Sequence, residues 1–126
     1  MGKPAHIRVM LAKGQSRTSQ SGSVVGTIFL RDQEIGYDDT WMRTVFASSN
    51  ESFSASVSFY LAEVTDPEAF QLVHVFSSST KTPTMQSASF SNPFDTEPLI
   101  ECRLASEEEG TACVLGSAEL ILSGNS

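Results

Sequence analysis

The sequence predicts an all-β protein, an antiparallel β-sandwich of about eight strands. The first observation is a nearly unbroken alternation over 52–64, where apolar residues alternate with residues that are mostly serines. This period of two is that of a strand with one buried and one wet face. Secondly, short apolar segments recur along the chain between turns rich in Gly, Pro, Ser and Asp, and no long segment has helical spacing. The expected core residues of 52–64 are Phe53, Ala55, Val57, Phe59 and Leu61.

The first half of the chain contributes four expected strands. Residues 6–13 alternate as a strand and lead into a polar loop over 14–23 that contains no large apolar residue. Residues 24–31 are apolar on both faces, which predicts an interior position in a sheet. Residues 40–47 form a third strand with the only tryptophan, Trp41. Because a short turn joins this strand to 52–64, we expect the two to pair as a hairpin.

The second half continues in the same way. A strand over 70–76 is expected to place Phe70, Leu72 and Phe76 on one face. Weaker or shorter strands follow, and the last strand carries a glycine, Gly116, that is typical of a β-bulge. The further elements are a turn at 65–68, strands at 85–90, 99–104 and 112–122, a break at 92–98 and an acidic turn at 107–110.

Length, charge and composition limit the function. The 126 residues form one expected domain, 1–126, with a net charge of -7, which disfavours nucleic acid and anionic membrane surfaces as partners. The sequence shows no apolar segment of a signal peptide or membrane span, so an intracellular, cytoplasmic location is expected. A longer native chain with this domain as its N-terminal part would give the same pattern.

No pattern of catalytic or metal-binding residues is found, so we expect no enzyme activity, cofactor or metal. Cys102 and Cys113 are expected as small buried thiols, with their redox state left open, and His74 as a structural histidine at the edge of the core. Four acidic residues near one turn could meet a calcium ion, but a solvated acidic loop is favoured. These are Asp32, Glu34, Asp38 and Asp39.

Four segments of the sequence are similar to segments of a known family. Residues 7–14, Ile-Arg-Val-Met-Leu-Ala-Lys-Gly, look like the opening strand of that family, and 115–122, Leu-Gly-Ser-Ala-Glu-Leu-Ile-Leu, look like its closing strand. The alternating strand from Phe53 to Leu61 and the segment 72–76 also sit where C2 domains place strands. The resemblance implies a C2-like sandwich. Because the loops that hold calcium in this family contain no acidic residue here, it implies a calcium-independent domain that docks on protein.

The leading hypothesis is therefore a non-catalytic interaction module with a protein partner. Its candidate contact residues are large side chains on the outer faces of strands, Met10, Tyr60 and Trp41. One alternative is a viral or phage structural or accessory subunit, since small β-domains suit repeating shells. This alternative is consistent with an oligomer.

The other alternative is a sandwich that binds glycans or small ligands. Sugars are bound by stacking on aromatic rings beside carboxylates, and Trp41, Tyr37, Asp38 and Asp39 offer both groups close together in the sequence. A position in the core is nevertheless the favoured expectation for Trp41.

Overall fold

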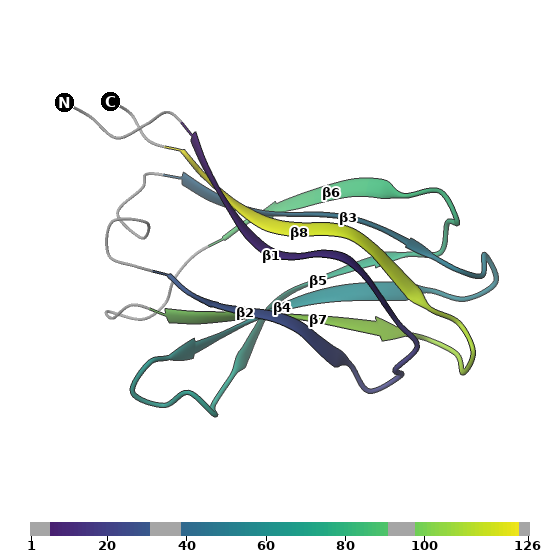
Figure 1. The fold of residues 1–126 in the computed structure, drawn as a ribbon, viewed down its shortest axis with the longest axis horizontal. Helices are drawn as coiled ribbons and strands as arrows, with labels where there is room; N and C mark the ends of the chain where they lie inside the picture. The colour runs from purple at the N-terminus through teal and green to yellow at the C-terminus, as the bar shows by residue number, and fades with distance from the viewer. Residues whose placement is uncertain (1–5, 31–38, 91–97, 124–126) are drawn as a thin grey trace.

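Eight antiparallel strands make up the computed structural model, which describes residues 6–30, 39–90 and 98–123 (Figure 1). The side chains of residues 6, 7, 39 and 123 lie outside this description. Within the described ranges the chain forms strands and turns, and no helix there could cross a membrane. The strands are β1 (His6–Arg17), β2 (Ser23–Phe29), β3 (Asp39–Ser48), β4 (Ala55–Glu63), β5 (Gln71–Ser78), β6 (Thr84–Ser89), β7 (Pro98–Ser106) and β8 (Cys113–Ser123).

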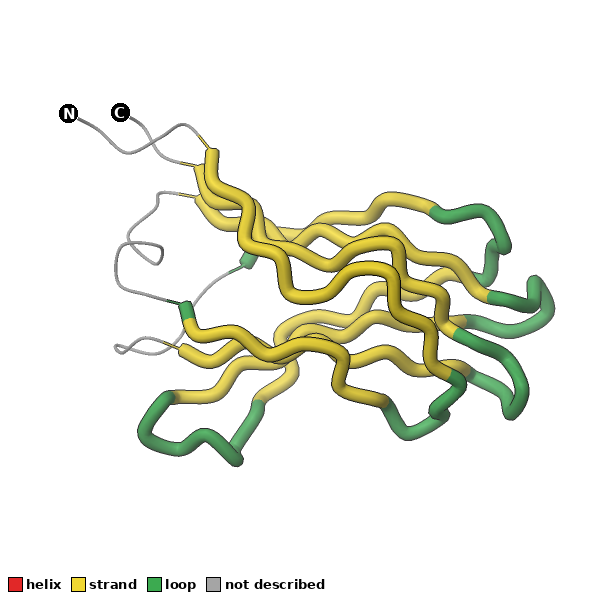
Figure 2. The backbone as a smooth tube through the Cα atoms, viewed as in Figure 1, coloured by secondary structure: helices red, strands yellow, loops and turns green. Residues whose placement is uncertain are grey.

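The strands form two four-stranded sheets that pack face to face (Figure 2). Sheet A has the order β1-β8-β3-β6 and sheet B the order β2-β7-β4-β5. Only β4 and β5 are consecutive strands of one sheet, and each other described strand is followed by a strand of the opposite sheet. This order is that of a double-sheet jelly roll. The predicted antiparallel β-sandwich is thus confirmed.

The core lies between the two sheets. It is built from the alternate residues of each strand that point inward. In β4, Ala55, Val57, Phe59 and Leu61 are buried, while Ser56, Ser58 and Tyr60 point outward and are half-buried. The predicted alternation of this strand is confirmed, except that Phe53 precedes the strand, in a turn where its N–H donates to the carbonyl of Asn50. Further core side chains come from both sheets, among them Met42, Phe46, Ile100, Leu104, Leu120 and Leu122.

The first strand is longer than the sequence predicts. β1 continues beyond residue 13 to Arg17, and Gln15, Ser16 and Arg17 pair with β8. Strand pairing uses backbone groups alone, so polar residues extend β1 wherever the long β8 offers a partner. The polar loop predicted for 14–23 is therefore confined to 18–22.

Two predicted strand arrangements are wrong. β2 lies at the edge of sheet B and not in its interior, and its apolar residues Val24 and Phe29 are exposed on the outer face. β3 and β4 belong to different sheets, so the short connection after Ser48 crosses the sandwich and does not form a hairpin. A short loop can join two packed sheets as easily as two neighbouring strands, and the sequence does not distinguish these cases.

Irregularities in register account for the remaining differences. A register shift beside Tyr60 turns Leu72 outward, opposite Tyr60, so Leu72 and Phe76 do not share a face as predicted. In contrast, the bulge predicted at Gly116 is confirmed, because the register between β3 and β8 shifts between Val45 and Phe46. A Cβ atom on Gly116 would lie 3.2 Å from the carbonyl oxygen of Val45.

Candidate functional site

The outer face of sheet A carries the only tryptophan of the chain. Met42, Thr44 and Phe46 of β3 point into the core, so the alternate residues Trp41 and Arg43 point to the outer face. The side chain of Trp41 is 44% exposed. The expected core position of Trp41 is therefore wrong, and its ring is available to a ligand.

Beside Trp41, two arginines converge on one buried carboxylate. Arg8 of β1 donates from Nε to Oε2 of Glu119 at 2.9 Å and from Nη2 to Oε1 at 3.1 Å. Arg43 donates from Nε and Nη2 to Oε1 at 2.9 and 2.7 Å. Glu119 is on the central strand β8, directly opposite Arg43, and is only 2% exposed. A charge so deeply covered requires partners of opposite sign, and the strand order supplies one from each side.

The ion-pair network sets the ionisation of Glu119. Burial alone would raise the pKa of this carboxyl, but the hydrogen bonds and positive charges of Arg8 and Arg43 outweigh burial, and its pKa lies below the usual 4.5. Glu119 is therefore ionised at neutral pH and holds both guanidinium groups in fixed positions.

Ser87 and Ser89 of β6 are exposed opposite Arg43 and Trp41, where their hydroxyls add hydrogen-bonding groups. We call Trp41, Arg8, Arg43, Glu119 and Met10 the sheet A platform.

The candidate contact residues predicted from the sequence divide between the two faces. Met10 is exposed on sheet A opposite Glu119 and so joins Trp41 on the platform. Tyr60 lies on the outer face of sheet B, where the guanidinium carbon of Arg103 is 3.9 Å from the centre of its ring. Arg103 also pairs with Glu101, Nε to Oε2 at 2.7 Å. Tyr60 is thus covered by Arg103 and is not brought together with Met10 and Trp41.

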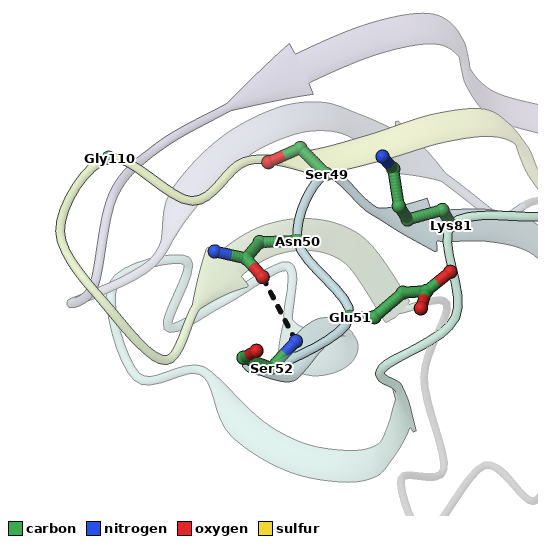
Figure 3. Close-up of a pocket in the computed structure, with 6 residues that line it drawn as sticks. All are labelled: Ser49, Asn50, Glu51, Ser52, Lys81 and Gly110. Atoms are coloured by element: carbon green, nitrogen blue, oxygen red, sulfur yellow. Dashed lines mark hydrogen bonds between the residues drawn. The ribbon is translucent and has the colours of Figure 1, made fainter.

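A polar hollow of about 470 Å³ lies among the loops at one end of the sandwich (Figure 3). A neighbouring hollow of about 510 Å³ shares Glu51 and Lys81 and adds Ser79, Thr80, Thr82 and Thr84. Together the two hollows present hydroxyl, carboxylate, amide and ammonium groups, and none of the residues that line them is aromatic. The residues that line the first hollow are Ser49, Asn50, Glu51, Ser52, Lys81 and Gly110.

The remaining sequence candidates are His74, the two cysteines and the residues around 32–39. His74 is half-buried at the core edge, with its ring 4.4 Å from that of Phe76, which matches the predicted structural histidine. Cys102 and Cys113 are buried free thiols, also as predicted. Asp32, Glu34, Asp38 and Tyr37, like the side chain of Asp39, lie outside the described residues. Within the described part, no three His, Cys, Asp or Glu side chains are placed to hold a metal ion.

The sequence alone did not indicate Arg8, Arg43 and Glu119 as residues of a candidate site. A signal was present, because each is a charged residue within an otherwise apolar strand segment, as in Leu-Ile-Leu after Glu119. A long charged side chain in such a position needs a partner across the sheet. The partner could not be named without knowing that β8 lies between β1 and β3.

Comparison with known proteins places the fold among β-sandwich modules. No family model and no curated protein matches the chain. The solved CBM36-1 domain of a multidomain xylanase from the hindgut metagenome of Trinervitermes trinervoides has a TM-score of 0.60 and 12% identity, with 96% of this chain and 98% of that chain covered. The xylan-binding module CBM15 has a TM-score of 0.57 and 13% identity, with the same coverage. At these identities the likeness shows a shared all-β sandwich fold, and the resemblance to C2 domains stays a prediction.

Proposed function

We propose that this chain is a non-catalytic carbohydrate-binding module and that the sheet A platform is its binding surface. The observation that carries the proposal is the exposed ring of Trp41 beside polar groups held in fixed positions. A sugar ring presents an apolar face, which stacks on an aromatic ring, and a rim of hydroxyls, which bind oriented donors and acceptors. Trp41 supplies the stacking surface, and Arg8, Arg43, Ser87 and Ser89 supply the donors.

The cost of exposing Trp41 supports a binding role. A tryptophan gains much of its stabilisation from burial of its large ring, and an unburied ring on a flat sheet contributes less to folding than it would in the core. Two other apolar side chains, Met10 and Met85, are exposed on the same face. Exposed apolar groups that gather beside oriented polar groups are typical of a recognition surface.

The comparisons support the same proposal at the level of fold. The similar structures are, by name, a xylan-binding module and a CBM domain of a xylanase, and jelly rolls are frequent among lectins and also among viral capsid proteins. Because one fold serves many functions, the argument depends on the platform and not on the fold. The hollow at the loop end offers polar groups alone and lacks the aromatic surface of the platform.

Binding to a panel of plant, microbial and animal glycans tests the proposal, with xylan among the probes. We expect at least one glycan to bind, to be followed by titration calorimetry and by the fluorescence of the single tryptophan. Trp41→Ala should weaken binding about 30-fold or more, as expected for a central aromatic contact. The matched control is Phe29→Ala, because Phe29 is equally exposed, at 45%, but on the outer face of sheet B.

The control variant should bind like the wild-type chain. Equal losses in Trp41→Ala and Phe29→Ala would show that sheet A is not the binding surface. A panel on which no glycan binds would reject the proposed function.

Docking on a protein partner, which the C2 resemblance implies, is the second candidate function. The outer face of sheet B favours it, because both of its edge strands expose apolar side chains there, Val24 and Phe29 on β2 and Leu72 and Val75 on β5. Loss of a partner from Phe29→Ala with glycan binding unchanged would support this second role. The predicted viral or phage subunit would instead be revealed by a stable large oligomer in size-exclusion chromatography with light scattering.

A further inference from the structure

Basic side chains gather on the outer face of sheet A although the whole chain has a net charge of -7. Lys13 lies opposite Ser117 in the row next to Glu119, so the described outer face carries Arg8, Lys13 and Arg43 against the single acid Glu119. The other acidic residues with described side chains lie in loops, at the end of β4 or on sheet B. These are Glu51, Glu63, Asp66, Glu68, Glu101, Glu107, Glu108 and Glu109.

Arg8 and Arg43 each bind Glu119 through one edge of the guanidinium group. A guanidinium has five N–H groups, and Arg8 and Arg43 each use the edge formed by Nε and Nη2 to bind Glu119. Among the hydrogen bonds of the described residues, neither Nη1 group has a partner. Arg8 is 62% exposed and Arg43 32% exposed, so their free N–H groups can reach solvent or a ligand.

This arrangement is suited to a planar anion. Among the described side chains of this face, one carboxylate, Glu119, is shared by two guanidinium groups, so one positive charge is left over. Guanidinium groups bind carboxylates through two parallel hydrogen bonds, and prior fixing of their orientation lowers the entropy lost on binding. Arg43 is two residues from Trp41 on the same face, about 7 Å along the strand, so one ligand can contact both.

We propose that the sheet A platform selects glycans that carry carboxylates, such as chains containing uronic acids. Trp41 stacks on a sugar ring, and Arg8 and Arg43 bind the carboxylate while Glu119 keeps both arginines in place. This inference rests on the proposed carbohydrate binding and specifies its ligand class. The acidic remainder of the protein would repel the same polyanion, which restricts binding to this face.

The test compares two forms of one polymer that differ at the carboxyl group, which is ionised in de-esterified polygalacturonate and a neutral methyl ester in the fully methyl-esterified form. We expect the carboxylated form to bind at least tenfold more tightly at low ionic strength and the difference to shrink with added salt. Arg8→Gln should weaken binding of the carboxylated form about tenfold or more, as for loss of a charge-assisted hydrogen bond. The same substitution should weaken binding of the ester by a clearly smaller factor, because the ester carries no charge and loses only a neutral hydrogen bond from Arg8.

Two further variants separate charge from geometry. Arg17→Gln removes the same charge from the end of the same strand, where Arg17 donates to the carbonyl of Ser16, and should bind like the wild-type chain. Arg8→Lys keeps the positive charge but lacks the planar guanidinium group that forms two parallel hydrogen bonds. Its affinity for the carboxylated form should lie between those of Arg8→Gln and the wild-type chain. Circular dichroism and thermal unfolding establish that each variant is folded.

Each outcome supports or overturns the inference. Equal binding of acid and ester, or binding of neutral glycans alone, would overturn carboxylate selection and leave carbohydrate binding intact. Dextran sulfate that binds as well as polygalacturonate and responds equally to Arg8→Gln would show a general anion surface, which also overturns it. If no glycan of either kind binds, the proposed function fails, and the inference fails with it.

Discussion

Arg43 and Glu119 lie directly opposite each other on β3 and β8, joined by two hydrogen bonds of 2.9 and 2.7 Å to one carboxylate oxygen. Arg8 binds the same carboxylate from the other side, on β1. The network connects three neighbouring strands, β1, β8 and β3, on the outer face of sheet A. It therefore both stabilises sheet A and orients the donors of the candidate site.

Replacement of Glu119 by Gln should lower the free energy of unfolding by about 2 kcal/mol, the order expected for charge-assisted hydrogen bonds. The folded-state pKa of Glu119 lies below its usual 4.5, so its ionised form stabilises the fold fully above that pH. This stabilisation is lost as the pH falls below 4.5 toward the lowered pKa. Urea unfolding between pH 7 and pH 3 should show a smaller acid-induced loss for the variant.

Glu109→Gln serves as the control for Glu119→Gln, because Glu109 is exposed in the loop between β7 and β8. The Glu109→Gln variant should have the same free energy of unfolding as the wild-type chain at every pH between 7 and 3. A Glu119→Gln variant with wild-type stability and unchanged pH dependence would contradict the structural role of the network.

Gly26→Ala should destabilise the protein by more than about 2 kcal/mol. A Cβ atom at Gly26 would collide with the carbonyl oxygen of Leu11, where β2 of sheet B passes close to β1 of sheet A. Because the obstacle is backbone, a side-chain movement cannot relieve it. Thermal unfolding should show a marked decrease in Tm.

Gly14→Ala provides the comparison for Gly26→Ala. Gly14 has φ +61° and open space around its Cβ position, so only the left-handed backbone conformation opposes alanine, at about 1–2 kcal/mol. Equal stabilities for the two variants would show that the close approach of β1 and β2 does not exist.

Cys102 and Cys113 should be unreactive in the native protein. Burial raises the pKa of both thiols to about 12, so neither forms an appreciable amount of thiolate near pH 8. Ellman's reagent at that pH should label neither cysteine until the chain is unfolded, and then both. Rapid labelling of either thiol without denaturant would contradict the buried positions.

Phe59→Ala should lower the free energy of unfolding by about 3–5 kcal/mol, as other substitutions that leave large cavities in cores do. The reason is that Phe59 is fully buried and its ring packs edge-on against that of Phe76, with ring centres 5.9 Å apart. The neighbouring Ser58→Ala should change stability by less than about 0.5 kcal/mol, since Ser58 points to the outer face. Similar losses in both variants, measured by urea unfolding, would refute the alternation of β4.

The candidate site could be predicted only in part. Trp41 and Met10 are candidate contact residues on sequence grounds because each is a large side chain in a strand, and both are exposed on sheet A. Tyr60 was grouped with them, although it lies on the opposite sheet beneath Arg103. Alternation assigns a residue to a face of its own strand, but it does not say which sheet that strand joins.

What the sequence by itself determined is local structure: the approximate strands, the buried face of β4 and the bulge at Gly116. These follow from period-two alternation and from glycine, which act over a few residues. The tertiary structure alone decided that β2 is an edge strand and that β3 and β4 belong to different sheets. It alone joined Arg8 to Glu119 across 111 positions, because the pairing of distant strands depends on how all inward faces can be buried at once.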